Sequence, residues 1–590
     1  MSLVQKIKEV SAKAIEDVFK ISTNIDSLLV NQTKPEFDGD YTVVLFALVK
    51  QLKKSPEDLG KAIGDYLVEN NTELFTSYNV IKGFLNLTVA DNYFSDFLSN
   101  NFGSPEFKFQ KTNKKIVVEY SSPNTNKPLH LGHLRNNFLG WSVAEILKAN
   151  GNNVIKTCVV NDRGVHICKS MIGWEMFANG ATPESTGTKG DHFVGDYYVK
   201  FSNELKKQTE QLVASGQSKE DAERNAPIMQ KTQQMLFDWE KGIPDVINLW
   251  KKMNGWVYKG FDETYKRIGT DFEKIYYESE TYLLGKRFVE EGLKQGVFYK
   301  KEDGSIWIDL SNEGLDEKLV LRKDGTSVYI TQDLGLAEEK FKDFRYDQSI
   351  YIIADEQNYH MKVLELILKK LGKPYAEGIF HLSYGMVDLP TGRMKSREGT
   401  VVDADDLVDE MVLEAEKKTK EKSKIEEFSP GELKDLYETL ALGALKFYLL
   451  KVDPKKRMVF NPEESIDFHG FTGPFIQYTY ARIKSILRKE PVQSELINKI
   501  KLEKLEKELL VLLDQYGDTV KQAALEYSPA VIANYIYSVA QGYNSFYTVH
   551  SVLKAETEDK KQLRLQLCQL TSNVIQHAMG LLGIKVPERM

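Results

Sequence analysis

The chain has 590 residues, which is too long for a single hydrophobic core and indicates three or four domains. Its composition, 42% hydrophobic and 28% charged, is that of an ordinary globular protein, and no apolar run approaches the ~20 residues that a membrane-spanning helix needs. The formal net charge of −7 mildly opposes a nucleic-acid partner but does not exclude one, because a basic patch is local.

The amino-terminal region, residues 1–108, predicts a domain of mixed helices and strands. Residues 1–20 predict an amphipathic helix with scattered charges rather than a signal peptide, so we expect a cytoplasmic protein. A β-rich segment follows at 80–89. Three cysteines form no C-x-x-C pair and indicate buried thiols in a reducing compartment: Cys158, Cys168 and Cys568.

The second region, residues 109–404, alternates predicted strands and helices. An apolar run at 116–120 predicts a buried strand, residues 136–149 predict a helix, and the β-rich run 154–160 predicts another strand. This is a βαβ unit, and the loop after its first strand lies at the carboxyl edge of the sheet, where open α/β sheets bind ligands.

That loop places two histidines around a glycine at the start of the helix. His130 and His133 can each donate a hydrogen bond to a phosphoryl oxygen without carrying a full charge at pH 7, and Gly132 lets the backbone approach a ligand. A helix amino terminus also favours an anion. An isolated H-x-G-H is more often a strand–turn–helix corner with two surface histidines, so the assignment depends on its wider context.

Residues 327–335 resemble the end of another strand. With a period of two, Tyr329, Thr331 and Asp333 share one face and offer an aromatic wall and a carboxylate. The alternative is a strand followed by an aspartate that caps a helix. Gln357 and His360 follow a further apolar strand, again in a carboxyl-end loop.

A basic run at 392–402, bracketed by glycines, follows a predicted strand end at 384–387. Its cations, which include Lys395 and Arg397, suit a mobile loop that closes over a triphosphate and stabilises departing pyrophosphate. Alone, the run is better explained as a surface turn with three positive charges.

The remaining segments are patterned as helices. We expect a polar helical insertion at about 191–265, a connector at 405–460 that opens with a charged, exposed helix, and a helical region at 461–590. In residues 467–487 aromatics are interleaved with cations, which fits RNA bases if they are exposed and a tyrosine-rich core if they are not. The side chains expected to project away from the core are Gln477, Tyr480, Arg482 and Lys484, as opposed to Phe475, Tyr478 and Ile483.

Together these runs resemble the arginyl-tRNA synthetases, a family of class I aminoacyl-tRNA synthetases. Residues 119–135 are similar to that family's HIGH signature, with Leu131 in place of isoleucine. Residues 392–402 are similar to its KMSKS loop, with Ser396 at the position of the second lysine. Residues 467–487 resemble its Gly-Pro-x-x-Gln-Tyr-x-x-Ala-Arg segment, so the resemblance covers essentially the whole chain.

The resemblance implies an α/β fold with three functional domains and a helical connector at 405–460. The catalytic domain, 109–404, would be a Rossmann-like parallel sheet with the helical insertion. An N-terminal α+β domain, 1–108, would bind the tRNA elbow, and the all-helical domain, 461–590, would bind the anticodon. We expect a monomer that uses tRNA(Arg), L-arginine and ATP with Mg²⁺, without a tightly bound cofactor, a metal site of its own or a membrane.

The implied reaction has two steps. The carboxylate of arginine attacks the α-phosphate of ATP to give arginyl-adenylate and pyrophosphate, and a hydroxyl of the terminal tRNA adenosine then takes the acyl group. By the resemblance, ATP would be bound by His130, Gly132, His133, His360, Gly385, Met386, Lys395 and Ser396. Charge would be stabilised by His130, His133, Lys127, Lys395 and Arg397, with Lys127 replacing the cation missing at Ser396.

A guanidinium is a planar fork of donors, so its pocket needs carboxylates. The resemblance assigns arginine to Glu119, Asn124 and Gln357 at its α-amino and carboxylate ends and to Glu278, Tyr329 and Asp333 elsewhere. Glu280 stays open as an alternative to Glu278, and Asp162 and His166 receive no role. The tRNA would meet Gln477, Tyr480, Arg482 and Lys484, near further stacking surfaces at Tyr535, Tyr537, Tyr543 and Tyr547.

Two other functions stay open from the sequence. One is a class I synthetase of cysteinyl, glutaminyl or methionyl type, which amino-acid activation assays would separate; the lack of a zinc motif weighs against the cysteinyl type. The other is a non-catalytic tRNA-binding paralogue, which predicts loss of the histidines or of the basic loop, whereas both are present.

Overall fold

The structure is a computed structural model that describes residues 2–34, 36–103, 111–389, 402–422, 427–493 and 500–590. The chain divides into two units. The first comprises Met1–Phe109, Lys417–Phe447 and Ile466–Met590, and the second comprises Gln110–Glu416 and Tyr448–Ser465.

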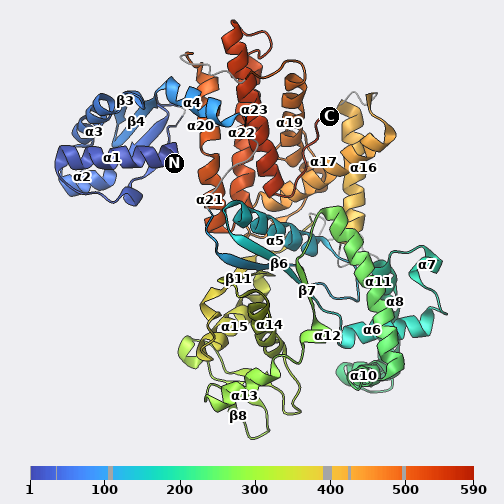
Figure 1. The fold of residues 1–590 in the computed structure, drawn as a ribbon. Coiled ribbons are helices and arrows are strands. Elements are labelled where there is room, and N and C mark those ends of the chain that lie inside the picture. The colour runs from blue at the N-terminus through green and yellow to red at the C-terminus, as the bar shows by residue number, and fades with distance from the viewer. Residues whose placement is uncertain (1, 35, 104–110, 390–401, 423–426, 494–499) are drawn as a thin grey trace. The chain divides into compact units, whose positions relative to one another are not determined.

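The second unit is built on a five-stranded parallel sheet of order β12-β11-β5-β6-β7 (Figure 1). Its strands are β5 (Lys115–Glu119), β6 (Asn153–Val160), β7 (Lys274–Tyr277), β11 (Gln348–Ala354) and β12 (Ile379–Tyr384). Helix α5 (Leu131–Ala149) connects β5 to β6, which confirms the predicted βαβ unit. The helix begins at Leu131 rather than at 136, because His130 serves as its N-cap.

Helices on the β11 side of the sheet enclose an apolar core with a small antiparallel sheet of order β10-β9-β8. These elements are α12 (Glu278–Thr281), α13 (Lys286–Lys294), β8 (Tyr299–Lys300), β9 (Ile306–Ile308), β10 (Lys318–Leu321), α14 (Tyr329–Phe344) and α15 (Asn358–Lys370). Two short parallel strands, β13 (Val387–Asp388) and β14 (Met458–Val459), pair elsewhere in this unit, which also contains α18 (Pro462–Ser465).

The strand end predicted at 327–335 is wrong, because this segment opens helix α14. Ile330, Leu334 and Ala337 are buried in the core at helical spacing, and this periodicity overrides the alternation that suggested a strand. Thr331 turns away from its expected face and donates a hydrogen bond to the carbonyl of Val320.

Helices occupy the chain between β6 and β7, where the sequence predicted a helical insertion at about 191–265; they run from Val165 to Ile268 and lie on the β7 side of the sheet (Figure 1). These helices are α6 (Val165–Phe177), α7 (Pro183–Thr186), α8 (Gly190–Ala214), α9 (Lys219–Asn225), α10 (Pro227–Glu240) and α11 (Pro244–Ile268). Helices α8 and α11 approach closely, since a Cβ added at Gly190 would lie 2.0 Å from the carbonyl oxygen of Trp256.

The first unit combines the amino-terminal sheet with the carboxyl-terminal helices. The antiparallel sheet has the order β1-β2-β4-β3, from β1 (Val30–Gln32), β2 (Tyr41–Val44), β3 (Phe75–Ile81) and β4 (Phe84–Val89). The β-rich segment predicted at 80–89 is therefore a hairpin corner, with Lys82 and Gly83 in left-handed backbone conformations. The helix predicted at 1–20 is confirmed as α1 (Leu3–Phe19). The other helices of this region are α2 (Phe46–Leu52), α3 (Pro56–Asn70) and α4 (Asp91–Asn101).

The helical pattern expected after residue 405 is also confirmed. The helices are α16 (Ala404–Lys422), α17 (Pro430–Leu450), α19 (Gly473–Leu487), α20 (Lys504–Asp514), α21 (Tyr516–Glu526), α22 (Pro529–Val549) and α23 (Glu558–Leu581). All three cysteines are buried free thiols, as predicted.

Candidate active site

The histidine loop, residues 121–135, lies between the carboxyl end of β5 and the first turns of α5. The His130 and His133 rings are close, with their centres 3.8 Å apart, and the backbone N–H of His130 donates to His133 Nδ1 at 3.1 Å. Because Nδ1 accepts this bond, the proton of a neutral His133 is on Nε2, from which it can be donated.

Both imidazoles are neutral near pH 7. Burial, and then the neighbouring Lys127 ammonium, lowers the pKa of His130 to about 4. Burial, with His130 and Lys127, lowers the pKa of His133 well below its ordinary value. The loop therefore offers uncharged hydrogen-bond donors at a helix amino terminus, beside a half-buried lysine whose own pKa burial lowers.

The basic loop lies outside the described residues, and so do Lys395, Ser396 and Arg397. The segment after it, 402–404, pairs with the histidine loop: Leu131 N–H donates to Val402 O at 2.9 Å, and Ala404 N–H donates to Leu129 O at 3.0 Å. The chain thus returns from the basic loop directly against His130.

Gly385 and Met386 follow β12, as the predicted strand end requires. The N–H of Gly385 donates to Pro454 O at 2.9 Å, and the carbonyl of Met386 accepts from Met458 N–H at 3.1 Å. A Cβ at Gly385 would lie 2.5 Å from the Arg457 nitrogen, so only glycine fits this approach.

A cavity of about 690 Å³ opens at the carboxyl edge of the sheet. All the residues predicted to bind arginine line it, together with His360: Glu119, Asn124, Glu278, Tyr329, Asp333 and Gln357. Glu280, the alternative to Glu278, is exposed and does not line this cavity.

The carboxylates of this cavity have different environments. Burial raises the pKa of Glu278 to about 7, Arg163 opposes the rise, and the charges of Asp162 and Asp333 add to it. Asp333 Oδ2 lies 2.5 Å from His360 Nε2, and this hydrogen bond raises the pKa of the imidazole. His360 therefore lies beside the predicted arginine residues, whereas its expected neighbour was ATP.

Tyr329 and Asp333 reach the same cavity although the predicted strand is a helix. Residues four apart lie on one helix face, so the pair survives the change of secondary structure, whereas Thr331 does not. Tyr329 is 78% exposed and forms an edge of the cavity.

Two residues that received no role from the sequence are connected to this cavity: His166 lines it, and Asp162 contacts Ser279, the residue after Glu278. The buried Asp162 carboxylate accepts hydrogen bonds from Ser279 N–H (2.8 Å), Ser279 Oγ (2.7 Å) and Tyr258 OH (2.8 Å), and so holds the residue after Glu278. His166 lines the cavity and contacts Tyr198 OH through Nδ1 at 3.1 Å. Both residues follow strand β6 at the carboxyl edge of the sheet, and this position could have identified them as candidate site residues from the sequence.

The side chains expected to face tRNA divide into two groups, and two of them need correction. Gln477 and Tyr480 are buried: Gln477 Nε2 donates to Thr439 O and Lys585 O, and Tyr480 OH contacts Glu588 at 3.3 Å. They hold the carboxyl-terminal segment, because α19 turns these positions toward α17 and the chain end. Lys484 is half-buried and pairs with Glu588 at 3.5 Å.

Two partly exposed tyrosines, Tyr478 of α19 and Tyr547 of α22, surround Arg482. Its guanidinium lies 4.9 Å from the ring centre of Tyr478 and 5.4 Å from that of Tyr547, which are 40% and 37% exposed. The expectation that Tyr478 is core is therefore wrong. Of the other tyrosines, Tyr535 and Tyr543 are buried.

Among the helices of the described residues, none is long and apolar enough to cross a membrane.

Three family profiles match successive parts of the chain. "Arginyl tRNA synthetase N terminal domain" matches residues 5–89, "tRNA synthetases class I (R), catalytic domain" matches 98–461, and "DALR anticodon binding domain" matches 476–590.

The chain is also similar to proteins over their full lengths. An arginine–tRNA ligase of Flavobacterium psychrophilum is 51% identical over 604 residues, and one of Parabacteroides distasonis is 49% identical over 598 residues; both alignments cover 100% of each chain. The solved arginyl-tRNA synthetase of Thermus thermophilus has a TM-score of 0.81 at 25% identity and covers 100% of both chains. That of Plasmodium falciparum has a TM-score of 0.77 at 18% identity and covers 100% of this chain and 99% of its own.

Proposed function

The chain belongs to the arginyl-tRNA synthetase family of class I aminoacyl-tRNA synthetases and is an arginine–tRNA ligase, and on this premise we propose that L-arginine binds in the 690 Å³ cavity with its guanidinium between Glu278 and Asp333. One observation carries the proposal: two carboxylates from separate elements, α12 and α14, line one cavity. A planar donor fork is matched by such a pair of acceptors.

The opposite end of arginine is assigned to residues at other edges of the same cavity. Glu119 accepts the α-amino group, and Asn124 and Gln357 fix the carboxylate end. The loop that carries Asn124 is supported by β6, since Thr125 N–H donates to Asn161 O at 3.1 Å and Asn161 N–H donates to Pro123 O at 2.9 Å. Ligands without a guanidinium leave the carboxylates unpaired and are rejected.

ATP, as its Mg²⁺ complex, is assigned to the histidine loop. The Nε2–H of His133 and the imidazole of His130 donate to phosphate oxygens at the amino terminus of α5, Gly132 permits close approach, and Lys127 adds a positive charge. Lys395, Ser396 and Arg397 of the basic loop, and the backbone at Gly385 and Met386, complete this assignment from the family resemblance.

In the first step the arginine carboxylate oxygen forms a bond to the α-phosphorus while the bond to the bridging oxygen of pyrophosphate breaks. In the second, the hydroxyl oxygen of the terminal adenosine attacks the activated carbonyl, and AMP leaves. These protein groups position the reactants and stabilise charge that develops on the phosphate, so no covalent enzyme intermediate is required.

Recognition of tRNA(Arg) is assigned to two domains, in a monomeric, cytoplasmic enzyme. Residues 1–108 meet the elbow and 461–590 meet the anticodon, as the two terminal profiles support. Within the second, the exposed group of Tyr478, Arg482 and Tyr547 is better suited to stack on unpaired bases than the buried side chains of α19.

The direct test is aminoacylation of bulk tRNA with labelled arginine by the wild type, His133→Ala and Asp333→Asn. We expect His133→Ala to lose about 10²–10³-fold in kcat, the effect of removing one preorganised donor, with little change in the Kd of arginine. Asp333→Asn should instead raise the Kd of arginine. An Asp333→Asn enzyme with the wild-type Kd would contradict the pocket assignment.

A further inference from the structure

Residues 402–403 form a short extended segment that opposes His130 across an isolated antiparallel β-bridge. Asp403 is the residue paired with His130, and two backbone hydrogen bonds, at Leu131 and Ala404, hold the pairing. The position of residues 402–403 therefore affects the position of the loop that carries both histidines.

Helix α16 begins at Ala404, immediately after the bridged residue Asp403. The Asp403 carboxylate accepts hydrogen bonds from Asp405 N–H at 2.8 Å and Asp406 N–H at 3.1 Å and thereby caps the helix. The residue that pairs with His130 is thus the cap of α16, so contacts that hold the first turn of this helix also hold the partner of His130.

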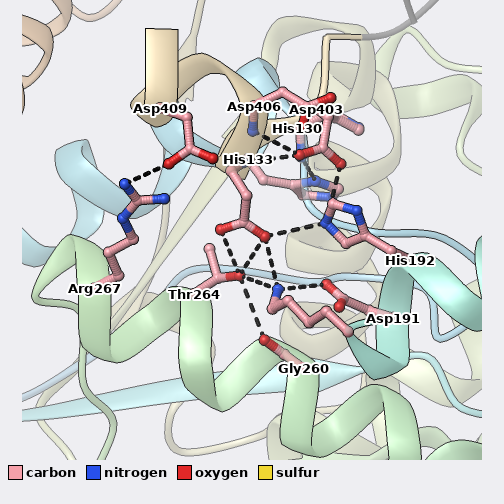
Figure 2. A network of polar contacts seen from close by, with 12 residues as sticks. His130, His133, Asp191, His192, Gly260, Thr264, Arg267, Asp403, Asp406 and Asp409 are labelled. Carbon is pink, nitrogen blue, oxygen red and sulfur yellow. Dashed lines mark hydrogen bonds and ion pairs between the residues drawn. The ribbon is translucent and has the colours of Figure 1, made fainter. Parts of the chain in front are cut away.

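The insertion contacts the start of α16 through a network of polar contacts, which Figure 2 shows with His192, Thr264 and Arg267 of the insertion beside Asp403 and Asp409. Asp405 Oδ2 accepts from Lys189 Nζ at 2.7 Å and lies 3.1 Å from His192 Nε2, and Thr264 Oγ1 lies 3.1 Å from Asp405 Oδ1. We name these four side chains, Lys189, His192, Thr264 and Asp405, the Asp405 cluster. His192 Nε2 also lies 3.5 Å from Asp403 Oδ2.

The insertion side of the Asp405 cluster is held rigidly. Lys189 Nζ also donates to Thr264 Oγ1 at 2.6 Å and to Asp191 Oδ2 at 3.0 Å, and Asp191 is fully buried. A Cβ added at Gly260 would lie 2.3 Å from Asp191 Oδ1, so α8 and α11 are in contact at this point. The Asp405 cluster is therefore closely packed against Asp191 and Gly260.

The chemistry of the corner is that of an ion-pair network. Asp191, His192 and Asp405 are close enough to hold a metal ion, but the Lys189 ammonium already bonds to both carboxylates and supplies the compensating charge. The lysine therefore takes the place that a bound cation would have. The side chains of this ion-pair network are largely shielded from water, which strengthens the attraction between their charges.

Helix α8 has a second contact with the histidine loop, one turn further along. A Cβ added at Gly195 would lie 3.0 Å from Pro128 Cδ and 3.7 Å from Lys127 Cα. The same helix thus supports the histidine loop at Lys127 and also contacts Asp405, which lies two residues after Asp403, the bridge partner of His130.

We propose that the Asp405 cluster is a set of positioning residues for the ATP-dependent step, through which the helical insertion sets the histidine loop against the phosphates. The inference rests on the proposed contact of His130 and His133 with ATP. None of the four side chains lines the arginine cavity, so their effect is expected on ATP and not on arginine.

The test compares Asp405→Asn with Asp406→Asn, which removes the same charge one residue away at an exposed position. From initial rates of tRNA aminoacylation, Asp405→Asn should lower kcat/KM for ATP at least tenfold, while the Kd of arginine, measured by calorimetry, changes less than twofold. Asp406→Asn should match the wild type in both. His192→Gln, which keeps a donor, should retain more activity than His192→Ala.

Thermal melting monitors folding, and if Asp405→Asn does not fold, His192→Ala and Thr264→Ala carry the same comparison. Equal losses for ATP and arginine would overturn the proposal, and so would an Asp405→Asn enzyme with wild-type kcat/KM for ATP. A His133→Ala enzyme with unchanged kcat would refute the proposed ATP site itself. If His133→Ala loses activity while Asp405→Asn does not, the positioning role of the Asp405 cluster is refuted and the proposed ATP site is not.

Discussion

Lys340 Nζ lies 2.6 Å from Glu119 Oε2, and the lysine is completely buried while the glutamate lines the cavity proposed to bind arginine. The ammonium also lies 3.8 Å from the ring centre of Tyr351. A buried ion pair adds little net stability, but loss of one partner leaves an uncompensated charge. Lys340 therefore supplies the opposite charge next to Glu119, the residue proposed to contact the α-amino group.

Lys340→Met should lower the free energy of unfolding by about 3–5 kcal/mol and weaken arginine binding, because the buried Glu119 carboxylate would lose the partner that holds it in place. Urea denaturation and calorimetry measure the two effects. Lys342→Met, at an exposed position of the same helix, is the control and should be within about 0.5 kcal/mol of the wild type. A Lys340→Met/Glu119→Gln double variant should regain part of the lost stability.

Arginine affinity should increase with pH around neutrality. Glu278 has a pKa of about 7 in the free cavity, and a bound guanidinium would lower it, so binding releases a proton wherever the free carboxyl is protonated. Linkage then predicts that the Kd of arginine falls about tenfold between pH 6 and pH 8. Calorimetry in buffers of different ionisation enthalpy measures the protons released.

Glu278→Gln should abolish most of this pH dependence and weaken binding throughout, whereas Glu280→Gln, at an exposed position, should preserve it. If the slope persists in Glu278→Gln, another group, such as the Asp333–His360 pair, is the source.

The His130 imidazole should stay uncharged near neutral pH. Burial and Lys127 hold the pKa of His130 at about 4, so this imidazole gains a proton only in acid, well below its ordinary pKa. Titration of histidine resonances by NMR should show His130 neutral at pH 5.5. Protonation above pH 6 would contradict its role as a neutral donor.

Much of the catalytic region was predictable because its chemistry coincides with simple local rules. β5, α5 and β6 follow from runs of apolar residues, and the carboxyl edge of the sheet then gathers the predicted arginine residues into one cavity. Tyr329 and Asp333 were identified for an incorrect reason, since a spacing of four serves a helix as well as the even spacing serves a strand.

The failures arise where tertiary packing decides burial. The polar groups of Gln477 and Tyr480 form hydrogen bonds with the chain's own carboxyl-terminal segment. No local sequence pattern reveals the position of that segment. Asp162 shows the same limit, because its donors come from α11 and from the start of α12, more than ninety residues later in the chain.

Asp162→Asn should displace Glu278 without removing any cavity-lining carboxylate. An amide cannot accept all of the hydrogen bonds that reach the Asp162 carboxylate from Ser279 and Tyr258, and each unsatisfied buried group costs about 1–3 kcal/mol. We expect reduced stability and a higher Kd for arginine. Asp245→Asn, exposed near the start of α11, should leave both unchanged.

The exposed group around Arg482 gives the sharpest test of the tRNA face. If Tyr478 and Tyr547 stack on bases, each substitution by alanine removes about 1–3 kcal/mol of binding free energy, which corresponds to a rise of roughly 5- to 150-fold in the KM for tRNA. The Kd of arginine should not change, because neither tyrosine lines the arginine cavity.

Tyr480→Phe is the matched comparison on the same helix. It removes only a buried hydroxyl that contacts Glu588, so it should alter stability slightly and leave the KM for tRNA unchanged. If Tyr480→Phe raised that KM as much as Tyr478→Ala, the carboxyl-terminal segment would have to move aside when tRNA binds, and the assignment first suggested by the sequence would be restored.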